Sequence, residues 1–223
     1  MKVTDLIQKV KNVLAGLNPG DKVAVVLRHG ASDPEMPKDT ISPKAEKDAN
    51  LLGQRLRKAG LKIEKVVTSP RGRAVATGLA VASGNANVGE SVAPFVTEHG
   101  LNDVSSEAMD VVATLKEFVA HSNVNSVEEA LLLCPDPDTK RYAWNKAGEY
   151  ARVISTRSRL NGRDPILFTT HGGPADIAIL RMANPTANNL TDLGRPAKWM
   201  PQGGAVIIVF NEAGDLVKSK CLF

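Results

Sequence analysis

The sequence predicts an α/β fold, a three-layer α/β/α sandwich with a mostly parallel central sheet and a helical insertion. Strand patterns alternate with amphipathic helical patterns over the first third of the chain, in the order β-α-β-α. This order implies parallel strands joined by right-handed crossovers. Apolar residues make up 43% of the 223 residues and aromatic residues only 4%. The chain can therefore bury one sizeable core, and that core must be mainly aliphatic.

Local signals define the first elements of this fold. Residues 23–27 form a continuous apolar run, typical of a strand that is buried on both faces. Ser42-Pro43 supplies a helix N-cap and a first helical residue, and Gly60 suits the end of that helix. Residues 61–68 predict the second strand, and the helix from Ser69-Pro70 runs towards Gly84.

The rest of the chain continues the alternation, with a helix-rich stretch in the middle. The further predicted elements are a helix over 3–17, a short strand over 92–97, helices over 105–120, from 126 and over 139–160, a strand over 165–170, a helix over 174–182 and a hairpin of strands 205–210 and 216–222. Residues 101–160 lack strand signals. We therefore expect them to form a helical insertion and partial lid on a single domain that spans residues 1–223.

Composition excludes several classes of partner. The net charge is only +4 and no long block of Lys and Arg occurs, so no nucleic-acid partner is expected. No apolar run approaches the length of a membrane span, and we expect no membrane partner. The two cysteines lie far apart, which fits a reducing compartment and predicts a cytoplasmic location. The edge of the C-terminal hairpin leaves a homodimer open.

Titratable side chains follow three of the predicted parallel strands. Arg28-His29-Gly30 ends the first strand, Arg71 and Arg73 follow the second, and His171-Gly172-Gly173 follows the strand over 165–170. Because parallel strands bring ligands to their carboxyl ends, we expect these residues to meet at one edge of the sheet. Arginines in the first turn of a helix oppose its dipole, and a bound anion would explain their position.

These residue types predict phosphoryl transfer. Two guanidinium groups can hold a phosphoryl group, and the backbone N–H of Gly172 at a helix N-terminus adds to an anion site. Neighbouring cations should depress the pKa of both imidazoles and keep them neutral. A neutral His29 can attack phosphorus to give a phosphohistidine, which water then hydrolyses. No cofactor and no metal are expected, since no pair among the four histidines has i, i+4 spacing.

Three motifs occur in a fixed order along the chain. They are Arg28-His29-Gly30, the run SPRGRAVAT from Ser69 to Thr77, and His171-Gly172-Gly173. With these motifs the chain resembles the histidine phosphatase superfamily, in its phosphoglycerate-mutase-like branch, from about residue 23 to residue 210. The resemblance implies the α/β fold predicted above and a phosphate pocket at the carboxyl ends of the strands.

The resemblance also implies a role for each matching residue. His29 would be the nucleophile, and Arg28 and Arg73 would clamp the phosphoryl oxygens. His171 would bind the same phosphoryl group and stabilise its transition state. Arg71 falls on a variable position of the second motif and ranks below Arg73.

The proton donor for the leaving group is expected in the segment PFVTEHGLND. In the family an acidic residue of this segment serves, and the segment offers Glu98 and then Asp103. Glu98 stands at the predicted strand end and is the preferred donor. His99 is adjacent, but neighbouring side chains on an extended strand alternate in direction.

One departure from the family pattern favours a phosphatase over a mutase. In the mutases the first motif continues with an acidic residue, Ser, Trp and Asn. Here Ala31 replaces the acid, and Glu35 stands where Asn would bind phosphate. A carboxylate there would repel a second phosphate group. The interpretation is a metal-independent phosphomonoesterase, a hydrolase that acts on a small phosphorylated substrate.

Three alternatives remain at this point. A phosphoglycerate-mutase-type phosphotransferase is disfavoured by Glu35. A protein phosphohistidine phosphatase would use an open, shallow site, which a helical lid over residues 101–160 would obstruct. A non-catalytic phospho-ligand binder on the same fold would be expected to have lost a histidine or an arginine of the set, and this chain has all four.

Overall fold

A single sheet lies at the centre of the molecule. The computed structural model describes residues 3–33, 35–37, 39–102, 106–122, 124, 127–193 and 199–223. The strands of the described part are β1 (Lys22–Arg28), β2 (Lys65–Thr68), β3 (Phe95–Thr97), β4 (Ile166–Thr170), β5 (Ala205–Phe210) and β6 (Leu216–Cys221). They form a six-stranded sheet in the order β3-β2-β4-β1-β5-β6. β1 to β4 pair in parallel, whereas β5 and β6 add an antiparallel hairpin beside β1.

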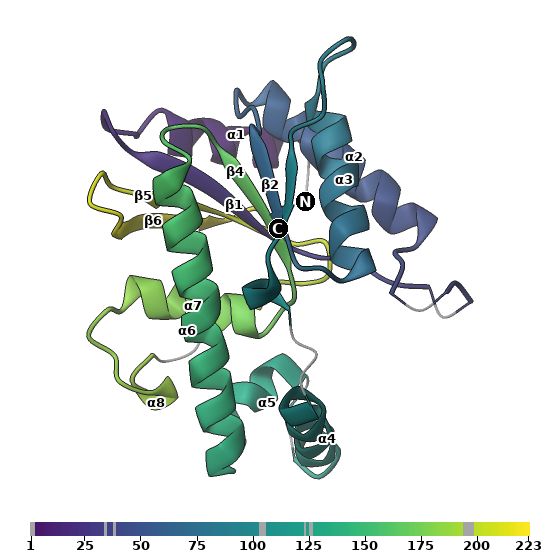
Figure 1. The fold of residues 1–223 in the computed structure, drawn as a ribbon, viewed down its shortest axis with the longest axis vertical. Coiled ribbons are helices and arrows are strands. Elements are labelled where there is room, and N and C mark those ends of the chain that lie inside the picture. The colour runs from purple at the N-terminus through teal and green to yellow at the C-terminus, as the bar shows by residue number, and fades with distance from the viewer. Residues whose placement is uncertain are drawn as a thin grey trace.

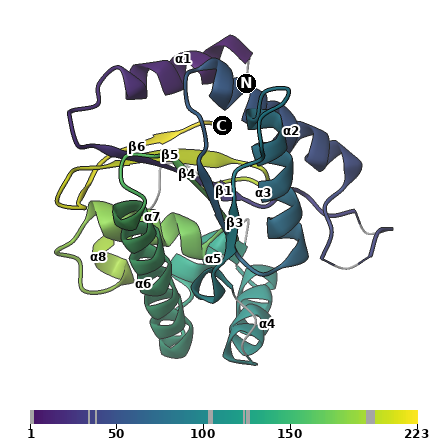
Figure 2. The same cartoon turned by 45° about the horizontal axis from the view of Figure 1, so that its top comes forward.

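Helices cover both faces of this sheet. They are α1 (Val3–Leu14), α2 (Pro43–Lys58), α3 (Gly72–Asn85), the 3-10 turn η1 (His99–Leu101), α4 (Ser106–Ala120), α5 (Val127–Leu133), α6 (Pro137–Leu160), α7 (Pro174–Ala183) and α8 (Leu190–Leu193). Helices α1, α2 and α3 cover one face, and α6 and α7 cover the other (Figures 1 and 2). The predicted three-layer α/β fold is therefore confirmed.

Alternation along the strands divides the core into two halves. In β1, Val23, Val25 and Leu27 pack in the cluster beneath α1, α2 and α3. Ala24 and Val26 point to the opposite face and join the cluster that includes α6 and α7. All five side chains are buried, which explains why the strand has no polar alternation.

The second strand is shorter than the sequence predicts, because part of the apolar run is buried without pairing in the sheet. Strand β2 begins at Lys65, not at residue 61. Leu61 and Ile63 are buried, but the Leu61 N–H donates to Leu56 O and the Ile63 N–H donates to Asn85 Oδ1. Packing against α2 and α3 thus accounts for the apolar residues that periodicity alone assigned to the strand.

The long helix α6 connects the sheet with the helices beyond it. It begins at Pro137, where the Asp136 side chain accepts the Thr139 N–H at 2.7 Å. Its buried residues Tyr150 and Ile154 belong to the core beneath the sheet, so this part of the predicted insertion is a layer of the fold. Helices α4 and α5 lie beyond the sheet, beside the far end of α6 (Figure 1). Their role as a partial lid stays a prediction.

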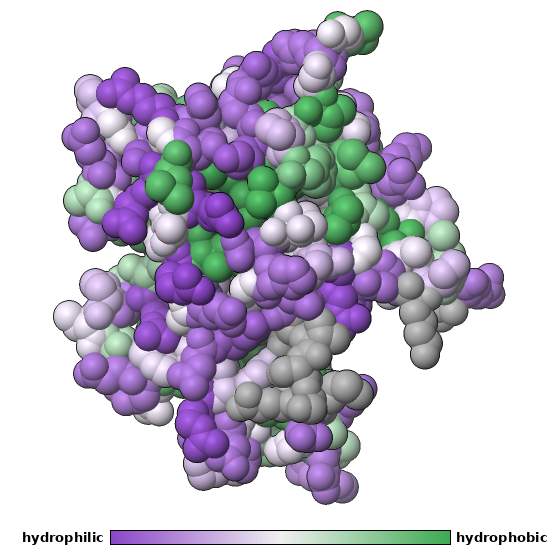
Figure 3. Space-filling model, in the orientation of Figure 1, coloured by the Kyte–Doolittle hydropathy of each residue, from purple (hydrophilic) through white to green (hydrophobic). Residues whose placement is uncertain are grey.

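The surface carries few large exposed apolar side chains. Figure 3 shows a mainly hydrophilic face, with hydrophobic residues gathered in the region of α3 and the segment after it. Leu79, Val88 and Val92 are the exposed apolar residues of this region. Of the helices that the structure describes, none combines the length and apolar character needed to cross a membrane. The homodimer expected from the β6 edge stays a prediction.

Candidate active site

The three motifs meet at the carboxyl ends of β1, β2 and β4. Arg28 pairs with Thr170 in the parallel register of β1 and β4, so His29 and His171 follow neighbouring strand ends. The His29 N–H donates to Thr170 O at 2.9 Å, and the Ser69 N–H donates to Thr169 O at 2.9 Å. Residues that lie 100 or more positions apart in the sequence are thus brought together by the strand order, as the sequence predicts.

His29 directly follows the carboxyl end of β1, and its ring is held in one tautomer. Its side chain is buried, and its Nδ1 lies 2.8 Å from Gly30 O. Because a carbonyl oxygen only accepts, Nδ1 carries the proton and the neutral ring keeps its lone pair on Nε2. Burial is the main cause that lowers the pKa of His29 to about 4, and the charges of Arg73 and Arg28 contribute in the same direction.

His171 lies beside His29 in an edge-to-face arrangement. The ring centroids are 5.1 Å apart and the ring planes meet at 61°. The Nε2 of His171 is 3.0 Å from Ser69 Oγ, which ties the strand end of β4 to that of β2. Burial lowers the pKa of His171 to about 3, and the charges of His29, Arg73 and Arg71 act in the same direction. Both imidazoles are therefore neutral at physiological pH.

Arg28 is fixed between two backbone segments. Its Nη1 donates to Met200 O at 2.9 Å. On the other side it lies against Gly172, where an added Cβ would come within 2.7 Å of the guanidinium carbon. The Met200 N–H in turn donates to Asp176 Oδ1 on α7 at 3.0 Å. The first glycine of the third motif is thus explained by the close approach of Arg28.

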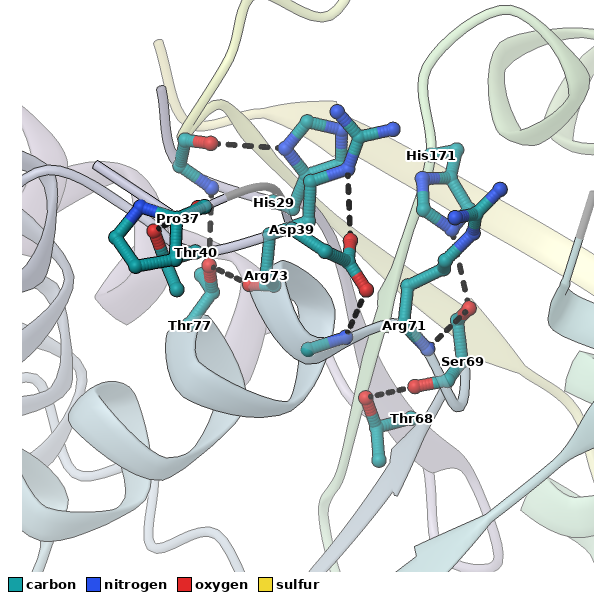
Figure 4. Close-up of polar contacts among 12 residues, drawn as sticks. His29, Pro37, Asp39, Thr40, Thr68, Ser69, Arg71, Arg73, Thr77 and His171 are labelled. Carbon is teal, nitrogen blue, oxygen red and sulfur yellow. Dashed lines mark hydrogen bonds and ion pairs between the residues drawn. The ribbon is translucent and has the colours of Figure 1, made fainter. Parts of the chain in front are cut away.

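Arg71 and Arg73 stand at the N-terminal end of α3. Both side chains extend from this end of the helix towards the level of the two imidazole rings (Figure 4). Thr77, one turn further along α3, accepts the Gly30 N–H at 2.9 Å and donates to Arg73 O at 2.6 Å. The threonine of the second motif thereby fixes α3 to the loop that carries His29.

The carboxylate of Glu98 is bound by an arginine of α6. Its Oε2 accepts from Arg157 Nε at 3.1 Å and from Nη2 at 2.6 Å. These hydrogen bonds lower the pKa of Glu98, with the charge of Arg157 acting in the same direction. Within the described part of the chain, Glu98 has no hydrogen bond to His29 or His171. Its expected role as proton donor stays a prediction.

The other acidic and titratable candidates among the described residues make no hydrogen bond to His29 or His171. Asp103 is not among the described residues. Glu35 is exposed, and its N–H donates to Asp33 Oδ1 at 3.0 Å. His99 and His121 are exposed. In the part of the chain that the structure describes, no three His, Cys, Asp or Glu side chains are arranged to hold a metal ion.

Two contributors to the site were not predicted from the sequence. Asp39 contacts Arg73 and the first residue of α3, and no motif signals this because it lies in a loop outside the three motifs. Met200 supplies a backbone carbonyl to Arg28 from a segment near the C-terminus, and a backbone contact leaves no signature in residue type. Both come to the site only through tertiary packing.

Several solved structures share this fold. A phosphoserine phosphatase from Entamoeba histolytica, in complex with 3-phosphoglyceric acid, aligns with a TM-score of 0.60 and 16% identity over 89% of this chain and 96% of its own. A phosphoglycerate mutase from Bacillus anthracis str. Sterne aligns with a TM-score of 0.59 and 15% identity over 89% and 91%. The protein histidine phosphatase SixA, complexed with tungstate, aligns with a TM-score of 0.54 and 12% identity over 90% and 97%. Comparison with curated protein sequences finds no match.

The family is established by a match to the sequence itself. The family model for the histidine phosphatase superfamily (branch 1) matches residues 24–212, which includes all three motifs and every strand end of the site. With the fold and the clustered His29, His171, Arg28 and Arg73 in agreement, the chain belongs to branch 1 of the histidine phosphatase superfamily.

Proposed function

We propose that the protein is a metal-independent phosphatase that hydrolyses phosphate monoesters through a phosphohistidine on His29. One observation carries the proposal. The Nδ1–H of His29 donates to Gly30 O at 2.8 Å, so the lone pair of the buried neutral ring is on Nε2. A nucleophilic nitrogen of fixed direction, grouped with two guanidinium groups, suits attack on an anionic phosphorus centre.

The reaction has two steps. The N–P bond to His29 forms in the first step and breaks in the second. First, Nε2 of His29 attacks phosphorus, the N–P bond forms, and the bond to the leaving oxygen breaks. Arg28, Arg73 and the neighbouring His171 stabilise the charge on the three peripheral oxygens. Second, water attacks phosphorus, the N–P bond breaks, and His29 regains its lone pair while inorganic phosphate forms.

The leaving oxygen of an alkyl ester requires a proton. Glu98 is the proposed donor because it follows β3 beside the strand ends of the site. In the structure it is ionised and paired with Arg157, since the hydrogen bonds from Arg157 lower its pKa. Donation by Glu98 therefore requires that substrate binding or closure of the site separate this ion pair.

A protein phosphohistidine phosphatase is a second candidate, favoured by the same ion pair. The leaving group of a phosphohistidine is an imidazole, which is a far better leaving group than an alkoxide. Such a substrate places little demand on a protonated carboxyl group, and the ionised Glu98 would suffice. The two candidates differ in which bond they cleave, P–O or P–N.

The test uses the wild-type protein, His29→Ala and the matched control His121→Ala, since His121 is exposed at the end of α4. Each is assayed in excess EDTA against an aryl phosphate, a panel of alkyl phosphates and a phosphohistidine peptide. We expect EDTA-resistant release of phosphate from the wild type and the control, and none from His29→Ala. An acid-labile, alkali-stable phosphoenzyme should form with labelled substrate only when His29 is present.

The outcomes separate the candidates. Hydrolysis of alkyl phosphates supports the monoesterase, whereas turnover of the phosphohistidine peptide alone supports the second candidate. Activity retained in a folded His29→Ala variant would show that His29 is not the nucleophile.

A further inference from the structure

We propose that Asp39 is a positioning residue of the phosphoryl site, which fixes the guanidinium group of Arg73 and joins the loop after His29 to the start of α3. The inference rests on the proposed function, in that it assigns the same cluster to phosphoryl binding. Asp39 lies outside the three motifs, and its position in the chain gives no sign of this role.

The backbone at Asp39 is held in an unusual conformation. Its φ is +73°, and it has the only positive φ of a non-glycine residue in the described part of the chain. Residues with a side chain rarely occupy this region, and they persist there only where surrounding contacts enforce it. The Asp39 carbonyl oxygen would lie 2.6 Å from a Cβ added at Gly72, so the loop presses directly on the first residue of α3.

The Asp39 carboxylate caps α3 from outside the helix. Its Oδ2 accepts the Gly72 N–H at 2.7 Å. Arg71, the N-cap residue by position, makes no side-chain cap hydrogen bond. A negative charge at a helix N-terminus is stabilising, and here it comes from a loop 33 residues earlier in the chain. Asp39 therefore sets the position of the helix end that carries both arginines.

The same carboxylate orients Arg73. Its Oδ1 lies 3.7 Å from Arg73 Nε, and this Nε has no hydrogen-bond partner within the described part of the chain. Figure 4 shows Asp39 on one side of the guanidinium group and the terminal nitrogens of Arg73 on the other, at the level of the His29 ring. Pairing on the Nε side leaves the terminal nitrogens available for a phosphoryl group.

A role for Asp39 as the proton donor fits these contacts poorly. Both carboxylate oxygens already face donors at the start of α3, Oδ2 the Gly72 N–H and Oδ1 the Arg73 Nε. Positioning and proton donation also differ in their consequences. Loss of a positioning residue slows aryl and alkyl esters equally, whereas loss of a proton donor slows alkyl esters selectively.

The experiment compares Asp39→Ala, Asp39→Asn and Asp136→Ala with the wild type. Asp136 is the matched control, because it also caps a helix by accepting a backbone N–H at 2.7 Å but does so at α6. Affinity for inorganic phosphate and vanadate is measured by titration calorimetry, which does not depend on turnover. The values of kcat and KM are measured for one aryl and one alkyl phosphate, and thermal unfolding is recorded for each variant.

We expect Asp39→Ala to weaken phosphate and vanadate binding by roughly 10-fold or more, and to lower kcat/KM equally for both esters. Asp39→Asn retains an acceptor for the Gly72 N–H and should recover a substantial part of the affinity. Asp136→Ala should lower thermal stability without changing the affinity for phosphate.

Three results would overturn the inference. One is an Asp39→Ala variant that binds phosphate and turns over both esters like the wild type. Another is a loss confined to the alkyl ester, which would make Asp39 a proton donor. The third is a wild type that binds neither phosphate nor vanadate, which would overturn the proposed function as well. A wild type that binds phosphate but hydrolyses no ester overturns the proposed function alone, and the binding data for Asp39 then decide this inference.

Discussion

The imidazole rings of His29 and His171 lie edge to face with their centroids 5.1 Å apart. His29 is buried and His171 is half-buried, and both lie near Arg28 and Arg73. Burial penalises a charged ring and is the main reason why the pKa values fall to about 4 for His29 and about 3 for His171; the neighbouring guanidinium groups act in the same direction. The cluster therefore combines neutral imidazoles with cationic charge from arginine, an arrangement that suits the proposed binding of a phosphoryl group.

Both rings should accordingly remain neutral well below the ordinary pKa of histidine. We expect ¹⁵N signals of His29 and His171 to keep neutral-imidazole shifts at pH 5.5, with the proton of His29 on Nδ1. The measurement is NMR of histidine-labelled protein, with His29→Asn and His171→Asn variants for assignment. A signal of His29 that titrates near pH 6.5 would contradict the burial argument.

The lowered pKa values of His29 and His171 predict that the free energy of unfolding decreases as the pH falls below 6.5. Between pH 6.5 and about 4, unfolded imidazoles bind protons, whereas His29 and His171 in the folded protein stay neutral. The free energy of unfolding should then fall as pH falls through this window, by about 1.4 kcal/mol per pH unit for each histidine at most. Denaturant unfolding at several pH values measures it. The slope should be smaller in His171→Asn, and an unchanged slope would refute the linkage.

Gly172 is predicted to matter through its contact with Arg28. A Cβ at this position would lie 2.7 Å from the guanidinium carbon, and Arg28 Nη1 is already bonded to Met200 O. In Gly172→Ala the guanidinium group must shift, and affinity for inorganic phosphate should fall by roughly 10-fold. The control is Gly16→Ala, where an added Cβ meets nothing closer than 3.4 Å. Equal phosphate affinity in wild type and Gly172→Ala would exclude this role for the glycine.

Thr77 is predicted to stabilise the fold and the site together. Thr77→Val keeps the shape of the side chain but leaves the buried Gly30 N–H without its acceptor, at a cost of about 1–3 kcal/mol in the free energy of unfolding. Thr77→Ser keeps both hydrogen bonds and loses only a methyl group. Activity should fall in the valine variant, because Gly30 also orients His29, and persist in the serine variant. If steady-state kinetics show that Thr77→Val is more active than Thr77→Ser, the proposed effect of Thr77 on the site is refuted.

The pair of Glu98 and Arg157 gives a prediction about leaving groups. Arg157→Met removes the hydrogen bonds that lower the pKa of Glu98, so more of the carboxyl group is protonated at pH 5–7. Relative to the wild type, hydrolysis of alkyl phosphates should rise over this range while aryl phosphates change little. Glu98→Gln should slow alkyl phosphates selectively. Losses of equal size on both ester classes in Glu98→Gln would show that another group donates the proton.

The sequence by itself determined the elements that carry the site. Apolar runs predicted β1 and β4, caps at Ser42 and Gly60 predicted α2, and the three motifs placed His29, Arg73 and His171 at strand or helix ends. These features are local or depend on the general geometry of parallel sheets, so they can be read without coordinates.

Tertiary structure decided the contacts that no periodicity encodes. Only packing could place Asp39 on the end of α3, bring Met200 to Arg28, and direct Glu98 to Arg157 on α6. Each joins segments far apart in the chain through a single side chain or a backbone carbonyl. The energy of such a contact depends on distance and burial in the folded molecule, and neither quantity can be inferred from residue type alone.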